Sequence, residues 1–109
     1  GGVAASRVAP LGPRLEISVR HAFRTDGGDL WDVRVVPRGG ETLTSIRLEP
    51  LRGAVRVHPP GHAEHVASGT LFLSRVSVAA GETGPCAVRI LQEGRVSRAY
   101  DVDLVEDTP

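Results

Sequence analysis

Residues 14–24 read RLEISVRHAFR, and this stretch decides the fold class. One face of the segment carries Leu15, Ile17, Val19, His21 and Phe23, and the positions between them are mostly charged or polar. A repeat of two residues places alternate side chains on opposite sides of an extended chain. The stretch therefore predicts a β-strand with one buried face and one solvated face.

The same alternation recurs in short segments along the chain, with glycine- and proline-rich turns between them. One segment presents Trp31 as the largest expected core side chain. Another has Leu71, Leu73, Val76 and Val78 as its expected inward side chains and changes its parity near Ser74, which suggests a bulge. No helical period is sustained anywhere. The sequence thus predicts an all-β protein, an immunoglobulin-like antiparallel β-sandwich of about seven strands. The predicted strands cover residues 14–24, 30–37, 43–49, 53–57, 71–78, 86–92 and 95–105, with 58–70 as a long loop.

Length and charge limit the possible classes of function. The chain has 109 residues, the size of one domain, and we expect a flexible linker at 1–13 and the sandwich at 14–109. Its 13 basic and 13 acidic residues give a formal net charge of zero, whereas nucleic-acid-binding domains usually carry a basic excess. The apolar runs are too short for a membrane-spanning helix. We therefore expect neither nucleic-acid binding nor membrane insertion.

The loop at 58–70 (HPPGHAEHVASGT) contains His58, His62, Glu64 and His65. Imidazole and carboxylate groups so close in sequence could surround Zn²⁺ or Cu²⁺ and leave a position for water. The spacing matches no standard zinc signature, and an exposed polar loop that happens to contain histidines is the favoured explanation. A metal-binding domain is thus an alternative function, and the main expectation includes no cofactor.

Three aspartates and the single cysteine are further candidates for a metal-binding or catalytic site. Asp26, Asp29 and Asp32 surround two glycines as Ca²⁺ ligands would, but they lack the alternate spacing of a Ca²⁺ loop. Two turn formers and an outward strand charge are the favoured explanation. Cys86 stands at a strand entrance without a neighbouring base, so we expect a packed structural thiol. No nucleophile–base pair is visible in the sequence, and we expect no enzymatic activity.

Every basic residue of the chain is an arginine, and several of them fall on outward positions of predicted strands. Outward acidic residues could pair with them on solvated sheet faces. Alternatively the arginines could form a docking surface for another protein, because arginine is enriched at interfaces. The candidate protein-interaction residues are Arg20, Arg34, Arg47, Arg56 and Arg89.

The segments 43–61 (LTSIRLEPLRGAVRVHPPG), 76–83 (VSVAAGET) and 87–104 resemble accessory β-sandwich domains in their order of strands and turns. Two groups share this pattern, the CARDB-type modules of large multidomain proteins and the appendage or ear domains of vesicle-coat adaptors and tethering complexes. Neither group is catalytic, and both recruit or space other proteins. The resemblance carries over no binding residue.

These observations together predict a non-enzymatic interaction or structural module of a larger protein or complex. Its partners would be other protein subunits or the remainder of its own chain, and an ear-like recruitment role in protein transport is an alternative. A homo-oligomer formed by edge pairing is not favoured, because Arg20, Arg24, Pro37 and Pro50 discourage strand addition. The compartment is not determined, although composition slightly favours an intracellular one.

Overall fold

The computed structural model describes residues 14–82 and 86–105. The predicted linker at 1–13 and the last residues of the predicted domain lie outside this range. No helix in the described part of the chain is long and apolar enough to cross a membrane. The described strands are β1 (Arg14–Thr25), β2 (Gly28–Arg38), β3 (Leu43–Pro50), β4 (Val55–Val57), β5 (His62–Val66), β6 (Phe72–Ala79), β7 (Ala87–Glu93) and β8 (Arg98–Asp103).

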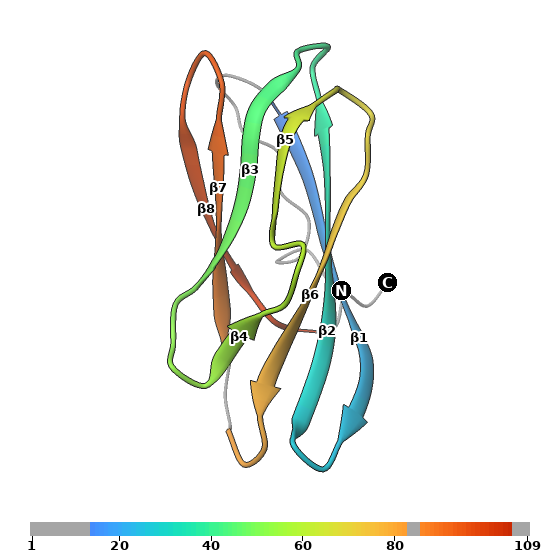
Figure 1. Ribbon diagram of the computed structural model, residues 1–109, viewed down its shortest axis with the longest axis vertical. Coiled ribbons are helices and arrows are strands. Elements are labelled where there is room, and N and C mark those ends of the chain that lie inside the picture. The colour runs from blue at the N-terminus through green and yellow to red at the C-terminus, as the bar shows by residue number, and fades with distance from the viewer. Residues whose placement is uncertain (1–13, 83–85, 106–109) are drawn as a thin grey trace.

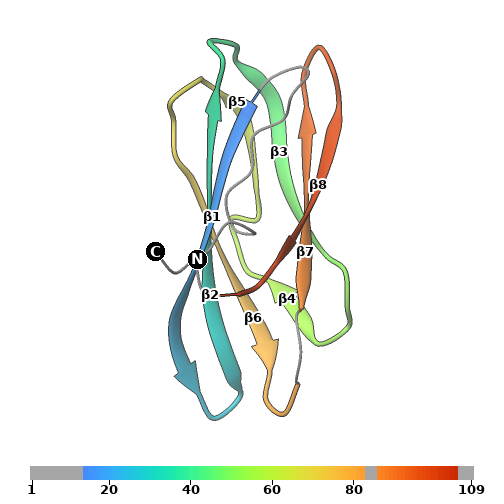
Figure 2. The same cartoon turned by 180° about the vertical axis from the view of Figure 1, so that it is seen from behind.

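The eight strands form two antiparallel sheets of four strands each. Sheet A has the order β1-β2-β6-β4, and sheet B has the order β5-β3-β7-β8. The two sheets face each other as two layers, which Figures 1 and 2 show from opposite sides. The predicted all-β sandwich is therefore confirmed.

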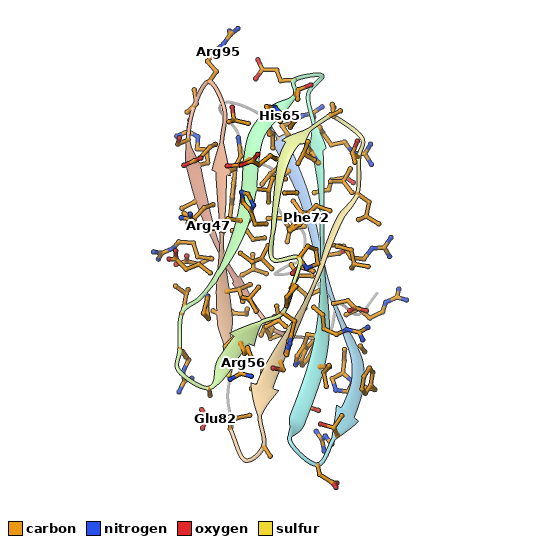
Figure 3. The ribbon with its side chains drawn as sticks, viewed as in Figure 1. Arg47, Arg56, His65, Phe72, Glu82 and Arg95 are labelled. Carbon is orange, nitrogen blue, oxygen red and sulfur yellow. The ribbon has the colours of Figure 1, made fainter. Side chains whose placement is uncertain are left out.

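The core fills the space between the two layers. It is built from side chains at alternate strand positions, as the period of two predicts. Figure 3 shows Phe72 between the sheets, and this side chain is 5 % exposed. Cys86 is free, buried and part of the same core. The buried apolar residues are Leu15, Ile17, Val19, Val33, Val35, Leu43, Ile46, Leu48, Val55, Val66, Phe72, Val76, Val78, Cys86, Val88, Ile90, Val102 and Leu104.

Strand β5 corrects the sequence prediction, because it lies inside the segment expected to be a loop. It pairs with β3 and forms one edge of sheet B. Its burial pattern is almost entirely exposed or half-buried, and only Val66 is fully buried. A polar edge strand has no alternation of apolar residues, so periodicity could not reveal it.

Strand β6 keeps one parity throughout, and the bulge expected near Ser74 is absent from it. Ser74 itself faces the core, where its Oγ accepts a hydrogen bond from the Gly61 amide at 3.2 Å and donates one to the His58 carbonyl at 3.4 Å. Leu71 and Leu73, which were expected to point inward, are 44 % and 46 % exposed. A polar side chain occupies this inward position because it bonds the segment between β4 and β5.

The irregularity lies in β1 instead, where the register shifts between His21 and Phe23. Phe23 was expected inside with His21, but it pairs with Leu30 across the hairpin and is 46 % exposed. Trp31 packs against the core while remaining only partly buried. A shift of one residue reverses which face a side chain occupies, and this explains why Phe23 lies outside.

Candidate functional site

The five candidate arginines are divided between the two sheets. Arg20, Arg34 and Arg56 lie on β1, β2 and β4 of sheet A, whereas Arg47 and Arg89 lie on β3 and β7 of sheet B. Figure 3 labels Arg47 and Arg56, one from each sheet. All five occupy outward strand positions, as expected. Because the sheets are opposite layers, however, no single face can contain all five.

The two sheet B arginines are engaged within the chain. Arg89 Nε lies 2.7 Å from Asp101 Oδ1, and Arg47 lies 3.9 Å from Glu49. The hydrogen bond between Arg89 and Asp101 raises the pKa of the guanidinium and lowers the pKa of the carboxyl group. The Arg89–Asp101 pair is the cross-strand ion pairing that competed with a docking role, whereas Arg47 and Glu49 both lie on β3.

The outer surface of sheet A differs, because the three candidate arginines on it form no such pair within the described residues. Arg20, Arg34 and Arg56 form no ion pair with any residue in 14–82 or 86–105. We call this surface the basic face, and six outward arginines on it stand against two outward carboxylates. The charged residues of the basic face are Arg14, Arg20, Arg34, Arg38, Arg56, Arg75, Glu16 and Asp32.

Large apolar side chains lie among these arginines. Leu73 pairs across the sheet with Arg34, and both Phe23 and Leu73 are 46 % exposed. The guanidinium of Arg75 lies 5.2 Å from the centre of the Phe23 ring, and its Nε lies 3.0 Å from Asp32 Oδ1. A cation held over an aromatic ring fixes the orientation of both groups. The basic face therefore presents a preorganised apolar feature surrounded by positive charge.

The outer surface of sheet B has the opposite charge. We call it the acidic face, and five outward carboxylates on it stand against two arginines. Its charged residues are Glu49, Glu64, Glu93, Asp101, Asp103, Arg47 and Arg89. The surface also contains an open depression of about 260 Å³, whose lining combines the apolar side chains of Leu91 and Ala99 with the charged side chains of Arg47, Glu93 and Arg98.

A cluster that the sequence analysis did not single out lies at the end of the β1–β2 hairpin. His21 Nε2 lies 2.9 Å from Asp29 Oδ1, and Arg24 Nε donates to the same oxygen at 2.8 Å. The His21 and Trp31 rings meet edge to face, with 5.0 Å between their centres. Together these four residues line an open depression of about 300 Å³. The hydrogen bonds from Arg24 and His21 lower the pKa of Asp29.

The lowered pKa of Asp29 predicts a loss of stability in acid. The ionised carboxylate is favoured by folding, so its contribution is present above the unfolded pKa, near 3.8, and is lost as the pH falls through the folded pKa. We expect Asp29→Asn to melt at a lower temperature than wild type at neutral pH, and we expect the difference to narrow as the pH falls below about 3.8. Asp26→Asn, at an exposed turn position, is the control and should match wild type throughout. A gap between Asp29→Asn and wild type that persists in strong acid would contradict this assignment.

The histidine segment does not assemble the hypothesised metal ligands. Within 14–82 and 86–105, no three His, Cys, Asp or Glu side chains are grouped to hold a metal ion. His58 Nε2 lies 2.8 Å from Ser77 Oγ of sheet A, whereas His62 and Glu64 lie on β5 of sheet B. His65, which also lies on β5, has a positive φ of 52°. The candidate ligands are close in sequence, but the structure divides them between the two sheets.

The three aspartates proposed for Ca²⁺ are also separated. Asp29 pairs with Arg24 and His21, Asp32 pairs with Arg75, and Asp26 lies exposed in the turn. Asp29 and Asp32 each have an arginine partner already, and this positive charge makes the two carboxylates weaker ligands for a cation. The described geometry is that of a turn and two ion pairs.

The sequence analysis missed the separation of charge between the two outer faces. The outward parity of each arginine was predictable, but the sheet to which each strand belongs was not. Exposed Phe23 and Leu73 were assigned to the core, so no apolar feature was expected on the surface. Comparisons with protein-family models, with curated proteins and with solved structures found no match.

Proposed function

We propose that this sandwich is a non-enzymatic protein-interaction module of a larger protein or complex, which binds an acidic protein surface through the basic face. The observation that carries this proposal is the combination of exposed Phe23 and Leu73 with Arg20, Arg34 and Arg56, whose guanidinium groups form no ion pair within residues 14–82 and 86–105. Aromatic side chains and arginine are the residue types most enriched where proteins bind one another.

The energetics of docking favour this face over the outer surface of sheet B. An arginine without an internal ion pair gives up no such pair when a partner's carboxylate approaches. Arg89, in contrast, would have to exchange Asp101 for the new partner. The excess of positive charge on the basic face also raises the rate of encounter with an acidic partner. The apolar side chains then supply the buried contact that holds the complex.

The strand order supports the immunoglobulin-like part of the proposal. When β5 is set aside, the two sheets have the orders β1-β2-β6-β4 and β3-β7-β8. This is the order of an immunoglobulin constant-type sandwich, with strands ABED in one sheet and CFG in the other. Strand β5 is then an addition beside β3. An appendage- or ear-like recruitment domain is the narrower alternative, and it would use the same surface.

The test is affinity purification from native cells of the protein that contains this chain. We expect Arg20→Glu/Arg34→Glu to reduce recovery of a specific partner by about tenfold or more, since both substitutions replace attraction by repulsion. Deletion of residues 14–105 should remove the same partner. The matched control is Arg52→Glu/Arg95→Glu, which makes the same charge change outside both outer faces, with Arg52 exposed after β3 and Arg95 at the tip of the β7–β8 hairpin (Figure 3). Equal recovery with both double variants would overturn the proposal.

A further inference from the structure

The chain carries zero formal net charge, yet its two outer faces have opposite signs. Six arginines and two carboxylates make up the charged residues of the basic face, and two arginines and five carboxylates make up those of the acidic face. A net charge near zero leaves no overall repulsion between copies. Each copy therefore presents to a second copy a surface of complementary sign.

The two faces also offer each other apolar contacts. The basic face projects Phe23 and Leu73, each 46 % exposed. The depression of about 260 Å³ on the acidic face is lined by the apolar side chains of Leu91 and Ala99 and by the charged side chains of Arg47, Glu93 and Arg98. An apolar side chain of the basic face can contact Leu91 and Ala99 there, while arginines around it meet Glu93 and the other carboxylates of the acidic face. This is the arrangement of a protein interface, with an apolar centre and a polar rim.

We propose that the partner of the basic face is the acidic face of a second copy of this domain. The inference rests on the docking role proposed above for the basic face and names its partner. The projection and the hollow lie on opposite sides of each copy, so the contact is heterologous. A pair of copies still has one unused basic face and one unused acidic face, so the assembly can extend beyond a dimer. Two sheets stacked by their faces do not pair their edges, so the arginines and prolines that discourage edge pairing do not oppose this contact.

The first test is sedimentation velocity of the 109-residue chain over a range of protein concentrations, in about 20 mM and about 500 mM NaCl. We expect the average mass to rise with concentration at low salt, and association to weaken by about tenfold or more at high salt. Phe23→Ser should weaken low-salt association to a similar extent without changing the charge. A wild-type chain that remains monomeric at low salt would overturn the inference.

The second test exchanges the charges of the two faces. The variant Arg20→Glu/Arg34→Glu/Arg56→Glu leaves three arginines against five carboxylates on the basic face. The variant Glu49→Arg/Glu64→Arg/Asp103→Arg gives five arginines against two carboxylates on the acidic face. Each variant alone should be monomeric, because its two faces then have the same sign, whereas an equal mixture should associate. Circular dichroism establishes that each variant is folded.

Two results of this exchange would overturn the inference, namely self-association of either variant as strong as that of wild type, or a mixture that stays monomeric although both variants are folded. Failure here is distinguishable from failure of the proposed function. If the chain does not self-associate but Arg20→Glu/Arg34→Glu still loses a partner in cells, the basic face binds a different acidic protein and only the second-copy assignment fails.

Discussion

Gly28→Ala is expected to cost more than about 4 kcal/mol of unfolding free energy, a large part of the stability of a domain of this size. Gly28 is buried where β2 begins, beside the end of β6, and its φ is 136°. A Cβ atom there would overlap the carbonyl oxygen of Val78 and lie 2.9 Å from the amide nitrogen of Ala80. All these obstacles are backbone atoms, so no rotation of a side chain can relieve the overlap.

The backbone around Gly28 also holds two sheet A neighbours together. The amide of Ala80 donates to the carbonyl of Gly27 at 2.9 Å, and Gly28 pairs with Ala79 in the β2–β6 register. Moving β6 away to admit a methyl group would break these bonds. The cost therefore combines an unfavourable backbone conformation with lost hydrogen bonds.

Urea denaturation monitored by circular dichroism measures this cost directly. Gly53→Ala is the matched control, because a Cβ at Gly53 would meet nothing within 4 Å and the residue has no left-handed φ. We expect the control to stay within about 0.5 kcal/mol of wild type. A Gly28→Ala protein as stable as Gly53→Ala would show that β6 can shift at this point.

The architecture could be predicted from the sequence because the packing of one side of each strand against the core causes both the alternation of residue types and the pattern of burial. Leu15, Ile17 and Val19 alternate with polar residues because one side of β1 packs against sheet B. This alternation can be recognised in the sequence alone. The pattern failed where another interaction fixed the parity. Ser74 faces inward because its hydroxyl bonds Gly61 and the His58 carbonyl, and the two neighbouring leucines then face solvent. The pattern also failed at Phe23, which the register shift turned outward.

The candidate site was predictable only as a set of exposed residues. Outward parity identifies Arg34 and Arg47 as solvent-facing, and both are exposed. Parity says nothing about the sheet to which a strand belongs, since that depends on long-range pairing such as β2 with β6 and β3 with β7. The separation of charge between the basic and acidic faces is a property of that pairing. It could not be read from the local sequence.

The second large effect is expected for Ile90→Ala. Ile90 is completely buried in β7, between the flanking strands β3 and β8, where it pairs with Leu48 and Tyr100. Removing three carbon atoms there loses apolar burial and leaves a cavity that neighbouring strands, held by hydrogen bonds on both sides, cannot close. We expect a loss of about 2–5 kcal/mol, measured by urea denaturation. A loss below about 1 kcal/mol would mean that the two sheets can approach each other to fill the space.

Leu73→Ala is the control for Ile90→Ala, and it separates folding from docking. Leu73→Ala is the same kind of truncation, but the Leu73 side chain is 46 % exposed on the basic face and is not a member of the buried core cluster. We expect its unfolding free energy to stay within about 0.5 kcal/mol of wild type, while association through the basic face weakens. Ile90→Ala should therefore lower the unfolding free energy more than Leu73→Ala does, and Leu73→Ala should weaken binding through the basic face. Leucine at this outward position would then be explained by the surface that it offers a partner, since the fold does not need it there.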